Sequence, residues 1–259
     1  ALGRVMRNLD RKEGKPGNNI QLTVDTELQS YIQTRLGSES ASAVVMNCKN
    51  GEILAIASSP SYDPNKFVKG ISYSDFNELR DNEFRPLASK TVQDAYPPGS
   101  TFKIVTALAA LEAKIIGQKD SFSCSGKLEV SNRFFHCWKN SGHGTMDLTK
   151  SLSESCDVYF YELALKVGIE RINKMATKLG LGIKHDVPMS AITKGLMPSR
   201  EWKLNNREQE WLVGDTVNAS IGQGYVLSSP LQLAVMAARL ASGKKVNPIL
   251  TKSINGRNI

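Results

Sequence analysis

The sequence predicts an α+β fold in which an antiparallel sheet is backed by helices. Two apolar segments, 43–46 and 53–57, flank the dipeptide Asn50-Gly51, which can adopt the positive φ angles of a hairpin turn. A strongly apolar helix is predicted over 101–114, and several more helices follow it. Early strands followed by later helices, without regular alternation of the two, are typical of the α+β class.

The composition is that of a globular chain with a sizeable core. Of 259 residues, 41% are hydrophobic and 22% are charged, and 33 Lys and Arg against 25 Asp and Glu give a net charge of +8. The basic residues are scattered and have no interleaved aromatic side chains, so we expect no nucleic-acid partner, whereas an anionic lipid surface is compatible with the charge. The sequence contains no uninterrupted apolar run of about 18 residues, the length that a membrane-spanning helix needs.

The first elements are a lead-in, a strand and a helix. Residues 1–19 are polar and contain Gly and Pro, and they lead to a strand predicted over 20–24. Asp25 is suited to cap the next helix, whose apolar residues recur at every fourth position until Gly37 ends it. After the hairpin, segment 59–65 contains two prolines and is predicted to be a loop, and a polar region follows it.

Helices dominate the rest of the chain. The helix 101–114 has few polar positions and should therefore be mostly buried. Residues 115–147 are predicted to be loop-rich, and two helices, 158–167 and 169–179, are separated by a single glycine. A capping-box spacing with proline at the first helical position predicts a last helix over 229–243.

The most informative motif is Ser100-x-x-Lys103, at the start of the apolar helix. This spacing puts a hydroxyl and an amine on one helical face, within hydrogen-bonding reach. The positive end of the helix dipole and an apolar surrounding both favour the neutral amine, which can take the serine proton and so activate a nucleophile. The alternative is an ordinary N-cap serine. A second Ser-x-x-Lys, Ser242 to Lys245, lies at a predicted helix end, where the dipole would keep the amine charged.

A second motif, Ser155-Cys156-Asp157, begins a predicted helix. The Ser155 hydroxyl can relay a proton to a leaving amine, and the Asp157 carboxylate can hold a lysine or a substrate amide. Taken alone the motif has little specificity, because the same spacing occurs in segment 61–63 and an Asx-turn or helix cap explains either copy. Its interest depends on its pairing with Ser100.

Three cysteines and a histidine form a possible metal site. Three thiolates and one imidazole complete a tetrahedral zinc shell with no open position, which is typical of a structural site; the four candidate ligands are Cys124, Cys137, His143 and Cys156. The alternative is a disulfide between two of these cysteines in an oxidising compartment. Cys48, in the hairpin turn region, is expected to be a packing or surface residue.

Taken together, these motifs resemble the transpeptidase domain of class B penicillin-binding proteins of the elongation type, the penicillin-binding protein 2 family. The resemblance covers essentially the whole chain. The segments that agree in order and spacing are 51–55, 59–65, 96–103, 155–161, 195–202, 214–216 and 220–224.

The resemblance implies the fold of the serine penicillin-recognising proteins and a role for each motif. Ser100 would be the acylated nucleophile, Lys103 its general base, and Ser155 with Asp157 the second motif. Substrate binding would fall to Gly222, Gln223 and Gly224. The serine would attack the bond between the two terminal D-alanines of a peptidoglycan stem peptide, and a neighbouring stem amine would resolve the acyl-enzyme into a crosslink. β-Lactams would trap the same serine, and the backbone N–H of Ser100 would supply half of the oxyanion hole.

The resemblance also implies a setting for the domain. Residues 1–19 would lead in from a pedestal and 20–259 would form the transpeptidase domain, at the periplasmic face of the inner membrane. The implied partners are a RodA-type glycan polymerase and MreC. Acyl transfer would need no cofactor, and a structural zinc would hold the loop 124–143 against the active site, since relatives of this type look able to hold a metal there with mixed Asp, His and Cys ligands.

One family motif is absent from the sequence. No Lys-Thr-Gly or Lys-Ser-Gly tripeptide occurs, and in the family that strand lies further downstream than the 35 residues that follow Gly224. We therefore expect the chain to be cut short at its C-terminus. Two alternatives remain: a β-lactam sensor or serine β-lactamase of the same fold, although no segment resembles the glutamate loop of the class A enzymes, and a non-catalytic scaffold.

Overall fold

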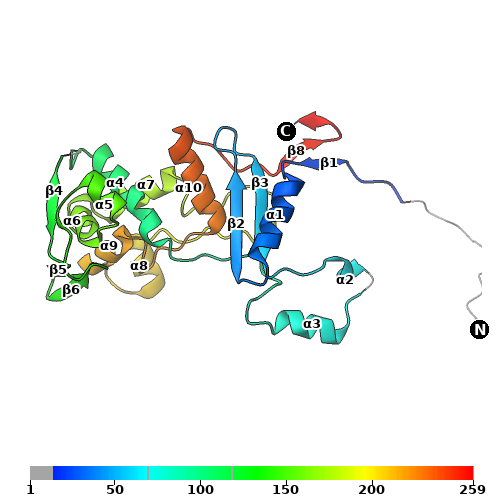
Figure 1. Cartoon of the computed structure of the whole chain (residues 1–259), viewed down its shortest axis with the longest axis horizontal. Coiled ribbons are helices and arrows are strands. Elements are labelled where there is room, and N and C mark those ends of the chain that lie inside the picture. The colour runs from blue at the N-terminus through cyan, green and yellow to red at the C-terminus, as the bar shows by residue number, and fades with distance from the viewer. Residues whose placement is uncertain (1–13, 69, 118, 259) are drawn as a thin grey trace, which may run out of the picture.

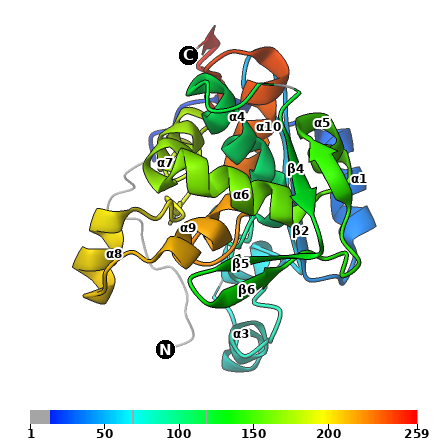
Figure 2. The same ribbon diagram turned by 90° about the vertical axis from the view of Figure 1, so that its left-hand side faces the viewer.

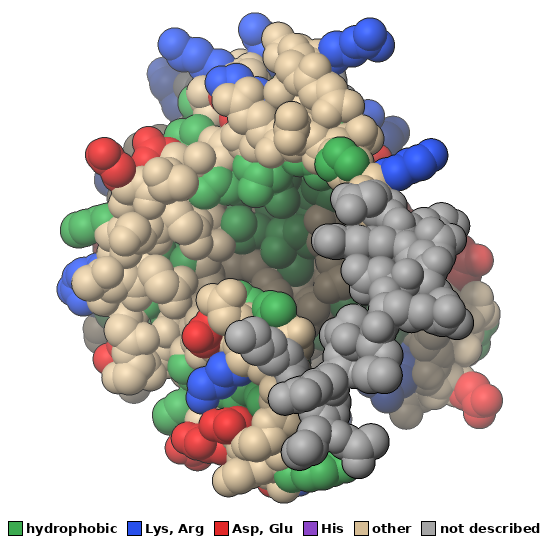
Figure 3. All heavy atoms as spheres, turned by 90° about the vertical axis from the view of Figure 1, so that its right-hand side faces the viewer, with side chains coloured by type: hydrophobic (Ala, Val, Ile, Leu, Met, Phe, Trp, Pro, Cys, Tyr) green, Lys and Arg blue, Asp and Glu red, His purple; other side chains and the backbone are tan. Residues whose placement is uncertain are grey.

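The computed structural model describes residues 14–68, 70–117 and 119–258. It is elongated, with a cluster of helices at one end and helix α10 (Pro230–Ser242) in the middle (Figure 1). At the other end lie helix α1 (Thr26–Leu36) and the hairpin of β2 (Ala41–Met46) and β3 (Ile53–Ser59). Seen from the hairpin end, the molecule is hollowed, and hydrophobic side chains line the hollow (Figure 3).

The N-terminal elements agree with the sequence prediction. They are β1 (Ile20–Leu22), α1 (Thr26–Leu36), β2 (Ala41–Met46) and β3 (Ile53–Ser59). The Asp25 carboxylate accepts the backbone N–H of Leu28 at 3.0 Å, as expected of an N-cap. β2 and β3 pair antiparallel. In the hairpin turn only Gly51 has a positive φ, of +85°, so the expectation that Asn50 shares this conformation was wrong.

A second small sheet brings the two ends of the described chain together. β1 pairs antiparallel with β8 (Thr251–Ile254), which pairs with β9 (Arg257–Asn258). The polar region after the hairpin contains two short helices, α2 (Asn65–Val68) and α3 (Tyr73–Arg80).

The apolar helix begins differently from the prediction over 101–114. A 3₁₀ turn, η1 (Gly99–Phe102), precedes α4 (Lys103–Glu112). Ser100 therefore lies in the tighter turn and Lys103 is the first residue of the α-helix proper. Most of α4 is buried, as predicted from its few polar positions.

Segment 115–147 corrects the prediction of a loop-rich region. It folds into two antiparallel ladders, in which β4 (Ser121–Cys124) pairs with β7 (Gly144–Asp147) and β5 (Lys127–Val130) pairs with β6 (Arg133–His136). Each strand has only four residues, too few for a recognisable alternation, and β4 and β7 are about 20 residues apart in sequence. Strand β4 packs against α6 (Asp157–Val167) and β7 against α5 (Leu148–Ser153), and local sequence does not reveal these contacts.

The later helices form the main core. They are α5 (Leu148–Ser153), α6 (Asp157–Val167), α7 (Ile169–Lys178), α8 (Arg200–Arg207), α9 (Val213–Ser220) and α10 (Pro230–Ser242). The break between α6 and α7 at Gly168 and the capping box of α10 are as predicted. α6 lies at the centre, with α4, α7 and α9 around it (Figure 2).

The sequence analysis missed the short helices α2, α3 and α5 and also α8 and α9, which are each eight residues long. The last two are joined through their side chains. A buried ion pair between Lys203 and Asp215, at 2.6 Å, joins them. This ion pair is a tertiary contact that local sequence does not reveal, and α9 in addition packs its buried Val217 and Ala219 in the core. With these additions, the α+β prediction and the antiparallel sheet backed by helices are confirmed. Among the described residues, no helix combines the length and the apolar character required to cross a membrane.

Candidate active site

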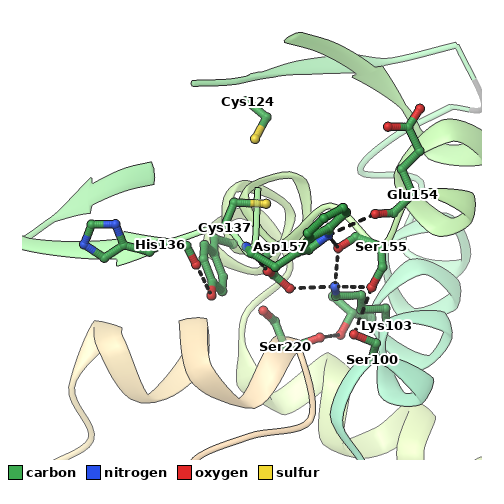
Figure 4. Close-up of polar contacts among 12 residues, drawn as sticks. Ser100, Lys103, Cys124, His136, Cys137, Glu154, Ser155, Asp157 and Ser220 are labelled. Atoms are coloured by element: carbon green, nitrogen blue, oxygen red, sulfur yellow. Dashed lines mark hydrogen bonds and ion pairs between the residues drawn. The ribbon is translucent and has the colours of Figure 1, made fainter. Parts of the chain in front are cut away.

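Four predicted catalytic residues converge from two helix starts. Ser100 lies in η1, Lys103 begins α4, Ser155 lies in the turn between α5 and α6, and Asp157 begins α6 (Figure 4). The sequence distance between the two motifs is more than 50 residues, so the packing of α4 against α6 is what creates the site.

The Lys103 amine is the centre of the site. The residue is only 1% exposed, and its Nζ lies 2.6 Å from Asp157 Oδ1, 2.8 Å from Ser155 Oγ and 2.8 Å from the Ser155 carbonyl oxygen. The ammonium thus has three acceptors, one of them charged, which compensates for its removal from water.

The Ser100 hydroxyl reaches this amine through Ser155. Ser155 Oγ donates to Ser100 Oγ at 2.9 Å, and Lys103 Nζ donates to Ser155 Oγ. This differs from the direct contact between Ser100 and Lys103 that the sequence spacing suggested. The reason is that Ser100 sits in a 3₁₀ turn while the amine is drawn toward the acceptors of the α5–α6 turn. The result is a continuous hydrogen-bonded chain of amine and two hydroxyls.

The α5–α6 turn holds Ser155 in an uncommon backbone conformation. Its φ is +51°, in the left-handed region that side-chain-bearing residues seldom occupy and that costs about 1–3 kcal/mol. Two backbone bonds support the turn: Ser155 N–H donates to the Leu152 carbonyl at 3.3 Å and Cys156 N–H to that of Ser151 at 2.9 Å. The conformation directs both the hydroxyl and the carbonyl of Ser155 at Lys103.

The segment after α9 packs against the turn that carries Ser100. Gly99 N–H donates to the Gly222 carbonyl at 3.0 Å, and a Cβ at Gly222 would lie 2.4 Å from the Gly99 carbonyl oxygen. Only glycine fits here, since Gly222 also has a φ of +69°. Gln223 is exposed, and Gly224 faces Asn218. A substrate-binding role for these three residues stays a prediction, whereas Gly222 has a structural role that the sequence did not reveal.

The four candidate metal ligands also meet in one place. Their ligand atoms, from Cys124, Cys137, His143 and Cys156, all lie within 4.8 Å of one another. His143 Nδ1 is 3.6 Å from Cys124 Sγ and 3.5 Å from Cys137 Sγ. All the cysteines in the described chain, Cys48 included, are free thiols, so the alternative of a disulfide is not formed here.

The cluster has the donor set and the surroundings of a zinc site. Burial raises the pKa of the Cys156 thiol to about 12, so a compensating positive charge is needed to keep this sulfur as a thiolate. His143 Nε2 is buried with no hydrogen-bond partner among the described residues, and the nearest carboxylate, Glu154 Oε2, is 4.0 Å away. At 4.0 Å the two groups form no hydrogen bond, but Glu154 is the kind of outer carboxylate that can orient a ligating histidine once it moves closer. Three thiols and an imidazole without an open position fit a structural zinc.

Sequence reasoning missed Trp138, which follows Cys137 directly. Its backbone N–H donates to Asp157 Oδ2 at 3.0 Å, and its indole Nε1 donates to the carbonyls of Glu154 and Ser155, each at 3.1 Å. No motif contains this residue. Its adjacency to a candidate metal ligand was the only available signal.

The fold and the site together define a class of proteins in which a serine and a buried lysine meet at the start of a helix, joined by the hydroxyl of a second serine. The chain belongs to the penicillin-binding-protein transpeptidase family, since the penicillin binding protein transpeptidase domain matches residues 41–258.

Similar proteins support this membership. Peptidoglycan D,D-transpeptidase MrdA of Salmonella typhimurium is 38% identical over 261 residues, which cover 99% of this chain and 42% of that protein. Penicillin-binding protein 2 of Pseudomonas aeruginosa superposes with a TM-score of 0.91 at 39% identity, over 94% of this chain and 56% of that one. Penicillin-binding protein 2 of Helicobacter pylori, solved in complex with MreC, gives 0.87 at 35% identity, over 90% and 44%. The chain thus spans less than half the length of the Salmonella protein.

The close approach at Gly222 gives a test of how the nucleophile turn is held. Gly222→Ala should lower the free energy of unfolding by about 3 kcal/mol, because the new methyl group meets the Gly99 carbonyl as well as paying for a left-handed φ. Gly243→Ala is the matched control: its φ is +65° and nothing lies near its Cβ position, so a loss of about 1 kcal/mol is expected. If urea unfolding shows the same loss of unfolding free energy for both variants, the clash between a Cβ at position 222 and the Gly99 carbonyl is contradicted.

Proposed function

We propose that the protein is a peptidoglycan D,D-transpeptidase of cell elongation, with Ser100 as the acylated nucleophile. The observation that carries the proposal is the hydrogen-bonded chain from the buried Lys103 amine through Ser155 to Ser100. The names of the relatives support the same activity. The domain need bind no cofactor for this chemistry, because the two serines and the lysine supply the nucleophile and the proton path.

The chain of hydroxyls provides the proton path for acylation. With the amine neutral, Ser100 donates to Ser155 and Ser155 to Lys103, the reverse of the direction seen with the ammonium, because hydroxyl protons rotate to suit their partners. As Ser100 Oγ bonds to the carbonyl carbon of the penultimate D-alanine, its proton passes to Ser155 and the Ser155 proton passes to Lys103. The Asp157 carboxylate stabilises the ammonium that forms.

The same path serves the second half of the reaction. The proton returns through Ser155 to the leaving nitrogen as the peptide bond breaks, and D-alanine departs. An amine from a neighbouring stem peptide then attacks the ester and its proton passes to Lys103 by the same route. As the bond between the carbonyl carbon and Ser100 Oγ breaks, the proton returns through Ser155 to Ser100 Oγ, which leaves the crosslink formed and the lysine neutral again. The backbone N–H of Ser100 would stabilise the oxyanion of both tetrahedral intermediates, and Gly222, Gln223 and Gly224 would contact the substrate.

We also propose a structural zinc held by Cys124, Cys137, His143 and Cys156. The metal would fix strands β4 to β7 against the start of α6 and would neutralise the thiolates. It has no part in acyl transfer, since the set leaves no position open.

The proposed setting follows the relatives. We infer that the protein acts at the periplasmic face of the inner membrane, with MreC and a RodA-type glycan polymerase as partners. A structure of the Helicobacter pylori relative with MreC supports the first partner. The alternatives, a β-lactam sensor or serine β-lactamase and a non-catalytic scaffold, differ in outcome: the first two also acylate Ser100, and the scaffold does not.

Acylation at Ser100 is tested by intact-mass spectrometry after incubation with a fluorescent penicillin. A single adduct is expected, and Ser100→Ala should abolish it. Ser242→Ala is the matched control from the second Ser-x-x-Lys motif and should keep the adduct, since Ser242 Oγ donates to the Ala238 carbonyl at the end of α10.

The assay is run on this chain and on a longer form that includes a Lys-Thr-Gly strand. An adduct in the longer form alone would show that acylation requires the Lys-Thr-Gly strand and would be consistent with the transpeptidase proposal. No adduct in either form would refute the transpeptidase and favour the scaffold. An adduct that hydrolyses within seconds would favour a β-lactamase.

The zinc proposal predicts one equivalent of zinc in the purified protein by elemental analysis. Cys137→Ser should lose most of the metal and several degrees of melting temperature, because a three-ligand site binds zinc less tightly and the strands depend on it. Cys48→Ser, the control, should keep the zinc and the melting temperature of the wild type. Absence of metal together with paired thiols in a thiol titration would establish the disulfide instead.

A further inference from the structure

Trp138 connects the cysteine–histidine cluster to the catalytic turn. It follows the candidate ligand Cys137, and its ring meets that of His143 edge-on, with centroids 5.2 Å apart. Its backbone N–H and its indole N–H both donate hydrogen bonds to the turn 154–157. We propose that Trp138 is a positioning residue for acyl transfer, which holds Ser155 and Asp157 in the geometry that Lys103 requires.

The indole of Trp138 donates a hydrogen bond to Ser155, the residue of the turn with a left-handed backbone conformation. Its Nε1–H is shared between the carbonyls of Glu154 and Ser155, at 3.1 Å each. The Ser155 carbonyl also accepts from Lys103 Nζ at 2.8 Å. The two donors therefore converge on one oxygen from different groups and fix the plane of the peptide that follows Ser155. Because φ of Ser155 is +51°, this peptide needs such support to stay in place.

The backbone N–H of Trp138 orients the Asp157 carboxylate. Its N–H donates to Asp157 Oδ2 at 3.0 Å, while Asp157 Oδ1 receives the Lys103 amine at 2.6 Å. Each oxygen of the carboxylate thus has its own donor, which prevents rotation about the bond that carries it. The position of the amine, and through it the distance to Ser155 Oγ, follows from this orientation.

Burial does not account for this residue. Trp138 is 64% exposed, so its ring contributes little apolar area to the core. An exposed tryptophan with all its N–H groups directed at two catalytic residues and their neighbour is better explained by those hydrogen bonds. It follows that loss of the indole N–H should disturb the turn with little effect on global stability.

The test compares Trp138→Phe with Trp211→Phe. The first removes the indole N–H but keeps an aromatic ring and the backbone donor. The second is a matched control, because Trp211 Nε1 donates at 2.8 Å to Thr216 Oγ1, on α9. Hydrogen exchange measured by mass spectrometry should be about tenfold faster over 154–157 in Trp138→Phe and unchanged there in Trp211→Phe, with zinc content and melting temperature retained.

The kinetic arm rests on the proposed function and uses whichever form of the protein acylates. Trp138→Phe should lower the rate constant for acylation by penicillin about tenfold and leave the binding constant of the non-covalent complex unchanged. A loss confined to the binding constant would make Trp138 a ligand contact and overturn the proposal, as would unchanged exchange over 154–157. If wild type does not acylate, the proposed function fails, and the exchange experiment still decides whether Trp138 orders the turn.

Discussion

The structure depends on a lysine ammonium that has been removed from water. Lys103 is buried at the start of α4. The carboxylate of Asp157 and two oxygens of Ser155 compensate for the loss of hydration of its ammonium group. Loss of one partner from a buried ion pair typically costs about 3–5 kcal/mol, because the other charge is left uncompensated. The pairing therefore constrains how α4 and α6 pack, and the position of Ser100 follows from that packing.

One turn serves two purposes. Residues 154–157 carry the hydroxyl and the carboxylate that we propose are catalytic, the candidate metal ligand Cys156 and the carboxylate of Glu154 near His143. A metal held by the cluster would fix the position of Cys156, which lies between Ser155 and Asp157 in sequence, so the two functions are mechanically linked. The cluster is thus best understood as part of the framework of the active site, although it takes no part in the proton path.

The sequence was most informative where the chemistry is local. Ser100 with Lys103, and Ser155 with Asp157, are recognisable because each pair has a fixed spacing at a helix start, and the cysteine–histidine set is recognisable by residue type. The relay through Ser155 was not predictable, since it depends on the 3₁₀ turn and on the packing of α4 against α6. Strands β4 to β7 and the role of Trp138 were missed for a related reason: four-residue strands and a lone exposed tryptophan acquire their partners only in the folded chain.

The most direct measurement of the central interaction is a double-mutant cycle on the free energy of unfolding, with Lys103→Met, Asp157→Asn and the double variant. If the buried charge pair governs the packing of α4 against α6, each single change should be destabilising by about 3 kcal/mol or more, and the double variant should be little worse than Lys103→Met alone, which is a coupling energy of about 3 kcal/mol. Losses that simply add would show that the two residues act independently and would contradict the account.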